Sequence, residues 1–190
     1  MKRLLLLGGV LSLSMLGCGG SGDDTVGLLA TSSVNATIDT LVMDSDVVAW
    51  VDDAGSKATA CAPSFPSIPA ADSVNVVIKS TAYSNTGSMG LPLRIESATI
   101  TYTPANTDTP AMPPEFQAIG MTIPNGTSAT IPVRVATQEQ KIALYDVLAC
   151  NGPIYSYHTT ITFNITEIGT DKKITVSSSM SLRFSDFIDK

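Results

Sequence analysis

The sequence predicts an all-β fold in which two antiparallel sheets pack as a sandwich, with one short crossover helix. Apolar and polar residues alternate with a period of two over most of the chain after residue 73. Glycine, proline and asparagine separate these segments at short intervals, and a single stretch near 137–148 has helical spacing. This pattern fits a two-sheet sandwich better than a barrel or an α/β fold.

The first strands are expected before residue 52. Residues 34–38 alternate between apolar and polar side chains, and residues 47–51 form an apolar run around Trp50. The segment 62–72 contains three prolines, which lack amide donors, so we expect an extended connection over the surface there.

The middle of the chain predicts three further strands. Residues 74–79 alternate cleanly, whereas the apolar positions of 91–102 change from odd to even numbers, which predicts a β-bulge near Glu96 and Ser97. After a proline-rich loop at 104–114, residues 128–135 alternate around Pro132. Because proline cannot donate to a neighbouring strand, this strand should lie at an edge or turn Pro132 outward.

The strongest periodicity belongs to residues 155–166 and 174–184. Each segment places aromatic and aliphatic side chains on one face and hydroxyl-bearing side chains on the other. The residues between them, 169–173, include a glycine and polar side chains typical of a turn. We therefore expect an antiparallel hairpin with one face inward and one face in water.

One helix is expected between the strands that end near Val135 and begin near Tyr155. Thr137 and Gln140 have the spacing of a capping box, and Asn151-Gly152-Pro153 should end the helix. The predicted apolar face consists of Ile142, Leu144, Val147 and Leu148.

The N-terminus resembles a bacterial lipoprotein signal peptide. Two basic residues precede the apolar segment 4–16, and Met15-Leu16-Gly17-Cys18 occupies the lipobox, with Met15 where leucine is usual. The resemblance implies that residues 1–17 are removed and that Cys18 is acylated. Gly19, in place of an aspartate after the cysteine, implies delivery to the outer membrane, on its periplasmic or surface face.

This resemblance also implies the domain organisation. Residues 18–30 would comprise the acylated cysteine and a flexible tether, because residues 19–24 are small or acidic. Residues 31–190 would form a single β-sandwich domain.

Export to the envelope also bears on the other two cysteines. With Cys18 acylated, Cys61 and Cys150 remain in an oxidising compartment, so we expect a disulfide between them. A metal pair or a catalytic thiol is less favoured, because neither cysteine belongs to a C-x-x-C motif.

The order of strands over residues 73–187 is similar to that of immunoglobulin-like and fibronectin type III-like domains, which implies only the architecture. The antibody order of cysteine, tryptophan and cysteine does not occur, since Trp50 precedes both Cys61 and Cys150. No specific family is identified.

Charge and composition argue against several functions. The formal net charge of −6 repels phosphate backbones, so nucleic acid is not an expected partner. Catalysis is not expected, because His158 is the only histidine and lies on the polar side of its strand. No cofactor is expected.

Four aspartates are weak candidates for a calcium site. Asp44, Asp46, Asp52 and Asp53 flank the apolar run, but Asp44-Ser45-Asp46 lacks the glycine that a calcium loop requires. Solvation at loop ends is the simpler reading of these acids.

The expected function is a non-catalytic binding or structural module held to the membrane by its lipid, with another envelope protein as partner. The alternative is an accessory protein or enzyme acting on cell-wall or surface polysaccharide. A cleft of polar and aromatic side chains would favour this alternative, and one apolar patch would favour the binding module. We expect the candidate aromatic residues to pack in the core rather than form a binding platform: Trp50, Tyr83, Tyr155 and Tyr157.

Overall fold

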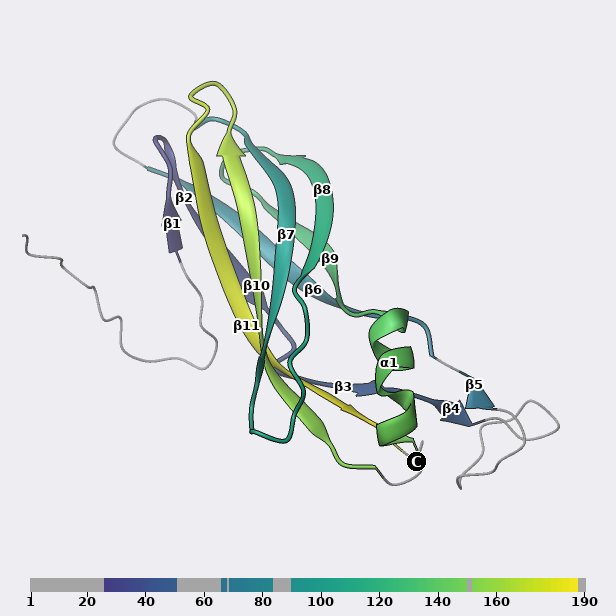
Figure 1. The fold of residues 1–190 in the computed structure, drawn as a ribbon. Helices are drawn as coiled ribbons and strands as arrows, with labels where there is room; N and C mark the ends of the chain where they lie inside the picture. Colours follow the sequence, from purple (N-terminus) through teal and green to yellow (C-terminus); the bar gives the residue numbers. More distant parts are fainter. Residues whose placement is uncertain (1–25, 51–65, 68, 84–89, 150–151, 188–190) are drawn as a thin grey trace, which may run out of the picture.

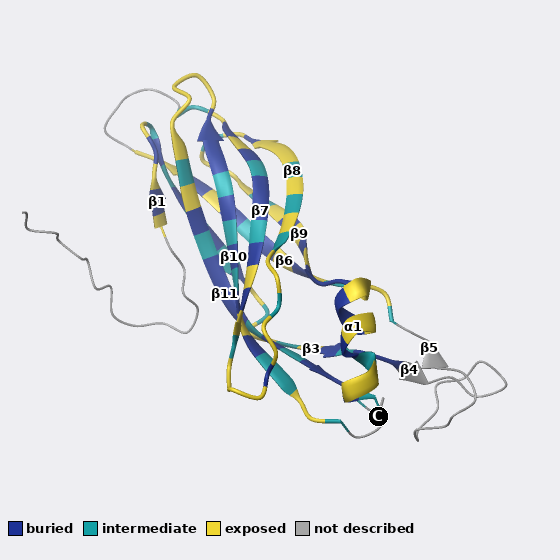
Figure 2. Ribbon diagram, viewed as in Figure 1, coloured by how far each residue is buried: buried dark blue, intermediate teal, exposed yellow. Residues whose placement is uncertain are grey.

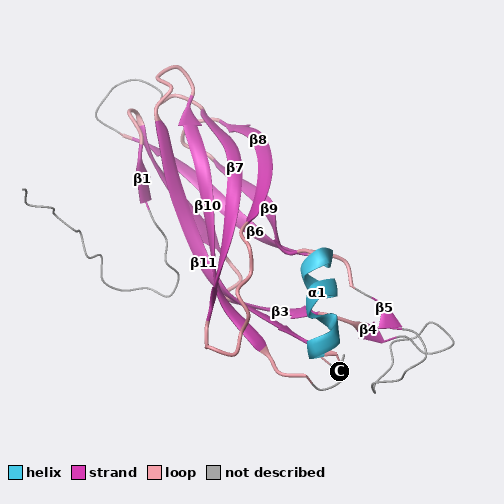
Figure 3. Cartoon of the chain, in the orientation of Figure 1, coloured by secondary structure: helices cyan, strands magenta, loops and turns pink. Residues whose placement is uncertain are grey.

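The computed structural model describes residues 26–50, 66–67, 69–83, 90–149 and 152–187. These residues form two packed β-sheets with one α-helix, α1 (Gln138–Leu148), which confirms the predicted all-β sandwich (Figures 1 and 3). Two short strands, β4 (Ala49–Trp50) and β5 (Pro66–Ser67), pair with each other outside the two sheets. They lie at the same end of the domain as α1 in Figure 1.

The first sheet has four antiparallel strands in the order β1-β2-β6-β9. Their bounds are β1 (Val26–Leu28), β2 (Ser32–Ile38), β6 (Asp72–Ala82) and β9 (Ser128–Ala136).

The second sheet has five strands in the order β3-β11-β10-β7-β8. Their bounds are β3 (Val42–Asp46), β7 (Leu93–Pro104), β8 (Glu115–Ile123), β10 (Tyr155–Glu167) and β11 (Lys173–Ser185). β10 and β11 pair along their length as the predicted antiparallel hairpin, whereas β3 runs parallel to β11.

The core lies between the two sheets, and the alternation along each strand decides which side chains enter it. On β10, Tyr157, Ile161 and Phe163 are fully buried together with Thr159, whereas the alternate residues His158, Thr160 and Thr162 are more accessible. Figure 2 shows this alternation of buried and more accessible positions along the strand. β2, β6 and β9 supply the opposite wall, mostly with valine and isoleucine. Such β-branched side chains suit this packing because they fit the pleated surface of a strand.

The predicted bulge is present in β7. Ile95 pairs with Ile165 and Ser97 pairs with Asn164, so that Glu96 has no opposite residue on β10. The register of β7 against β8 shifts at the same place. This extra residue explains why the apolar positions change from odd to even residue numbers along the strand, as expected for a bulge.

The prediction for Pro132 is also confirmed. β9 is an edge strand, and Pro132 is exposed. The side chain of Gln117, on the edge strand β8 of the other sheet, reaches this strand: its Nε2 donates to the Pro132 carbonyl (3.0 Å) and its Oε1 accepts from the Arg134 amide (3.0 Å). Gln117 thus occupies backbone groups that an edge strand otherwise offers to another chain.

The strand expected at 47–51 is present in part. Within this run β4 pairs with β5, whereas Val47 and Val48 are buried outside any strand. β3, which precedes the run, has no counterpart among the expected strands. β3 forms where it does because β11 supplies parallel backbone partners, and the Val47 amide then donates to the Ser185 carbonyl (3.0 Å). A pairing between segments this far apart in sequence leaves no local pattern.

The folded domain also reaches into the segment 18–30 that the sequence assigned to a tether. β1 pairs with β2, and its central Gly27 packs so closely on β11 that a Cβ atom there would lie 2.7 Å from the Ile174 side chain. A larger residue would require the Ile174 and Val176 side chains to shift.

The buried Glu167, at the end of β10, connects three segments at one end of the sandwich. Its carboxylate accepts from the Thr31 amide (3.0 Å), the Thr31 hydroxyl (2.6 Å) and the Thr170 hydroxyl (2.6 Å). The Thr31 hydroxyl in turn accepts from the Leu91 amide (3.0 Å). Burial raises the pKa of the Glu167 carboxyl, but these hydrogen bonds outweigh it and hold the pKa below its ordinary value.

We expect Glu167→Gln to lower the free energy of unfolding at pH 7 by about 1 to 3 kcal/mol, because hydrogen bonds to a charged acceptor are the stronger ones. Since folding lowers this pKa, the carboxylate stabilises the protein above its unfolded-state pKa, and the contribution is lost as the pH falls through the folded-state value. Unfolding measured from pH 7 to pH 3 checks this. Asp108→Asn, an exposed loop acid, is the control and should parallel the unaltered protein.

Candidate functional site

Helix α1 begins as predicted but buries a different face. The Thr137 hydroxyl accepts from the Gln140 amide (3.1 Å), and the Gln140 side chain accepts from the Thr137 amide (2.9 Å), which confirms the capping box. Leu144 and Leu148 are buried as expected, whereas Ile142 and Val147 are each 52% exposed. The other buried positions on the helix belong to Gln140 and Lys141.

The orientation of α1 follows from the contacts of Lys141, whose side chain is 1% exposed. Its Nζ donates to the Ala70 carbonyl (2.7 Å) and lies 2.9 Å from Oδ2 of Asp72, at the start of β6. The same Asp72 oxygen accepts from the Ser45 hydroxyl on β3 (2.7 Å). This network turns Lys141 inward and leaves Ile142 and Val147 on the outer side of the helix.

An apolar groove of about 530 Å³ lies between α1, the loop that precedes β8, and the start of β10. Most of its wall is apolar, with contributions from Ala111, Met112, Ala143, Val147 and Tyr155. The remaining lining residues are Pro110, Pro113, Glu115, Thr137, Glu139, Gln140, Leu144 and Tyr157. The volume falls within the range of about 300 to 1,000 Å³ typical of binding sites.

Tyr157 fixes the base of this groove. It is fully buried and packs edge-to-face against Tyr102 (6.2 Å between ring centroids) and Phe184 (5.9 Å). Its hydroxyl donates to the Pro110 carbonyl (3.0 Å), which holds the loop against the sandwich. Burial raises the pKa of Tyr157 and of Tyr102 to about 12, so both hydroxyls remain protonated donors near neutral pH.

Exposed apolar side chains occur in the groove wall and on the segments that form it. Val147, in the wall, is 52% exposed, and Ile142 on α1 and Ile154, just before β10, are each about half exposed. An exposed apolar wall is typical of an interaction surface.

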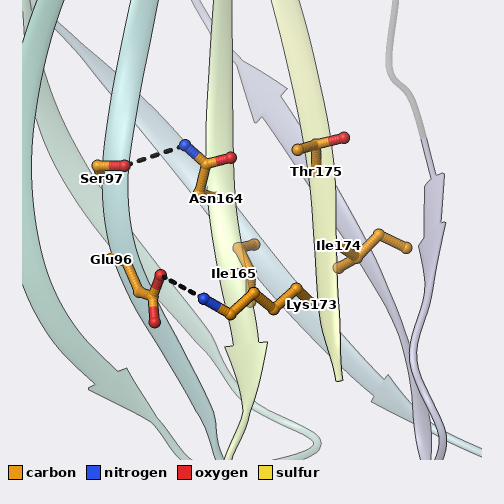
Figure 4. A pocket seen from close by; sticks show the side chains of 7 residues that line it. All are labelled: Glu96, Ser97, Asn164, Ile165, Lys173, Ile174 and Thr175. Carbon is orange, nitrogen blue, oxygen red and sulfur yellow. Dashed lines mark hydrogen bonds and ion pairs between the residues drawn. The ribbon is translucent and has the colours of Figure 1, made fainter. Parts of the chain in front are cut away.

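A second, polar hollow of about 480 Å³ lies at the bulge of β7, on the outer face of the five-stranded sheet (Figure 4). Glu96 on β7 and Lys173 on β11 form an ion pair across it (3.8 Å), and Asn164 Nδ2 donates to the Ser97 hydroxyl (3.0 Å). Ile165 and Ile174 also line this hollow, and its polar groups already bind one another.

The structure describes two of the four aspartates considered for calcium. Asp44 and Asp46 lie on β3 rather than in a loop, and the Asp44 carboxylate accepts from Nε (2.6 Å) and Nη2 (2.8 Å) of Arg183. These hydrogen bonds raise the pKa of the Arg183 guanidinium. Asp52 and Asp53 lie outside the described residues, and the part of the chain that is described holds no group of three potential metal ligands.

Of the other sequence candidates, Tyr155 and Tyr157 come together at the groove. His158 is exposed on the outer face of β10, opposite Ser181 and Thr103, as expected. Tyr157 is in the core and Tyr155 is half-buried at the groove, but Tyr83 is 37% exposed, against the prediction of a core position. Tyr83 lies directly after the last residue of β6. The side chain of Trp50 is not among those described.

Cys18, Cys61 and Cys150, which carry the lipidation and disulfide predictions, lie outside the described residues. Within the residues described, no helix is long and apolar enough to cross a membrane.

Sequence reasoning missed the groove and the burial of Lys141. The groove is formed by a loop, a helix and a strand that are separate in sequence, so no local sequence pattern predicts it. A signal for Lys141 did exist, since a helix with its lysine three residues before Leu144 and seven before Leu148 shares that face with both leucines. The charge of a lysine side chain argues against burial. Lys141 is buried because Asp72 provides a negatively charged partner for its ammonium group.

No protein-family model and no curated protein matches this chain. The functional argument therefore depends on the groove and on the signal-like N-terminus.

Proposed function

We propose that this protein is a non-catalytic binding module of the bacterial envelope, held at the outer membrane by an acylated Cys18. The groove beside α1 receives part of another envelope protein. The observation that carries this proposal is the apolar wall of the groove, in which Val147 is half exposed.

Burial of this surface by a partner is favourable because apolar area leaves water. The loop residues Pro110 and Pro113 cannot donate backbone hydrogen bonds, so side-chain packing dominates recognition on that wall. Tyr157 anchors the loop from beneath, which reduces the entropy that binding must overcome.

The polysaccharide alternative is less well supported by the same groove. Stacking on sugar rings requires accessible aromatic faces, and of the two lining tyrosines Tyr157 is fully buried. Tyr155 alone is partly accessible there. An apolar groove with a single accessible ring favours a protein partner.

A photoreactive amino acid placed at Ala143, in the groove, tests the proposal in living cells. We expect it to crosslink one discrete envelope protein, and we expect Val147→Glu to abolish the product by placing a charge on the apolar wall. The same probe at Thr101, exposed on the outer face of β7, is the control and should give no such product. Equal products from both positions, or none from Ala143, would contradict the proposed binding surface.

Acylation of Cys18 has a separate test. Mass spectrometry of the N-terminal peptide of the mature protein should show a lipid-modified cysteine. An unmodified N-terminus at a later residue would refute the anchor.

We also propose a disulfide between Cys61 and Cys150. Ala149 caps α1 immediately before Cys150, and Lys141 of α1 contacts Ala70, near the segment that contains Cys61. Such a bond would close a long loop and fasten the end of α1 to the connection between β4 and β6.

Replacing both cysteines with serine should lower the free energy of unfolding by about 2 to 5 kcal/mol, because the bond restricts the unfolded chain. Thiol labelling of the denatured, unreduced mature protein checks the bond directly. We expect no labelled cysteine, and labelling of both Cys61 and Cys150 would rule the bond out.

A further inference from the structure

The charged side chains that line the apolar groove all carry the same sign. Glu115, at the start of β8, and Glu139, in the first turn of α1, both contribute to the wall. No lysine or arginine is among the lining residues. The groove therefore combines an apolar wall with two carboxylates and no compensating cation in its lining.

The nearby basic residue of α1 does not neutralise these acids. Lys141 does not line the groove, and its Nζ contacts Ala70 and Asp72. Asp146 on α1 is exposed and carries a further negative charge. Both formal charges in the groove lining are thus negative, and the neighbouring apolar wall reduces their screening by water.

We infer that the groove selects a segment of the partner protein in which apolar side chains stand next to a lysine or arginine. This inference rests on the proposed function and names the chemistry of its partner. The apolar side chains occupy the wall formed by Met112, Ala143 and Val147. The cationic group lies by Glu115 and Glu139, where opposite charges favour association and set the orientation of the segment.

A segment with an acidic residue at the same place would be rejected. Its carboxylate would face Glu115 and Glu139 with no basic side chain of the lining to compensate. The same two glutamates thus supply both attraction to the correct partner and repulsion of the wrong one.

The experiment uses the full chain in cells, with the photoreactive residue at Ala143 as the probe. Glu115→Gln combined with Glu139→Gln keeps the shape of the groove and removes its charge. We expect the yield of the crosslinked product to fall by about twofold to thirtyfold, the effect of losing two exposed carboxylate–cation contacts.

The matched control is Glu96→Gln combined with Asp171→Asn, which changes the net charge equally on other parts of the surface. Asp171 has a φ of 55°, a conformation that asparagine also tolerates. The control should leave the yield unchanged. Thermal unfolding of both double variants verifies that they are folded, which matters because Glu139 in the first turn also interacts with the helix dipole.

Sequencing of the crosslinked peptide supplies the second readout. A partner segment with a lysine or arginine beside apolar residues is expected, and a segment without a basic residue would overturn the inference. Equal yields in the two double variants would also overturn it while leaving the proposed function intact. The absence of any product from Ala143 in the unaltered protein would overturn both.

Discussion

Replacing Tyr157 with alanine should lower the free energy of unfolding by about 3 to 5 kcal/mol, the range for removing a large aromatic side chain from a packed core. Tyr157 is fully buried and contacts both Tyr102 and Phe184 edge-to-face. Its removal leaves a cavity between these rings, and the rigid β10–β11 hairpin cannot collapse to fill it.

Tyr157→Phe distinguishes the contribution of the hydroxyl to stability from that of the ring. It keeps the ring contacts but leaves the Pro110 carbonyl without its donor, which should cost about 1 to 2 kcal/mol. Denaturant unfolding monitored by circular dichroism measures both effects. Tyr155→Ala, at a half-buried position, is the control and should cost less than Tyr157→Ala. Equal losses for the two alanine variants would show that Tyr157 is not the anchor of this region.

The Tyr157→Phe variant also links stability to function. Because the hydroxyl holds the loop that forms one wall of the groove, its loss should weaken the crosslink from Ala143 more than the stability change alone would suggest. An unaltered crosslink in a folded Tyr157→Phe protein would show that the loop is positioned by other contacts.

The second large effect is expected at the Lys141–Asp72 pair, and it should be asymmetric. Asp72→Ala leaves the Lys141 ammonium, with its side chain 1% exposed, without a counterion, and removing one partner of a buried pair costs about 3 to 5 kcal/mol. Lys141→Met should cost less, because the remaining Asp72 side chain is 32% exposed and still accepts from the Ser45 hydroxyl.

The double variant tests this explanation. If the cost of Asp72→Ala comes from the unpaired ammonium, adding Lys141→Met should recover part of the lost stability. Denaturant unfolding of the two single variants and the double variant gives the coupling free energy. A double variant less stable than Asp72→Ala alone would contradict the proposed origin of the cost.

The sequence determined the local elements of this protein. Strand alternation on β6, β9, β10 and β11, the capping box at Thr137 and the bulge at Glu96 all follow from neighbouring residues. Each of these features is visible within a short window of sequence. Strand alternation repeats every two residues, the two residues of a capping box are three apart, and a bulge shifts the alternation by one residue. The sandwich follows from them, because several half-apolar strands must cover one another's inner faces.

Only the tertiary structure decided which segments meet. The parallel pairing of β3 with β11 adds a strand at Val42–Asp46, before the run at 47–51, and the pairing of β1 with β2 extends the four-stranded sheet. Asp72 draws Lys141 inward, which rotates α1 and exposes Val147 at the groove. These outcomes depend on partners distant in sequence, and the energy of a charge or an apolar side chain is set by what surrounds it rather than by its neighbours along the chain.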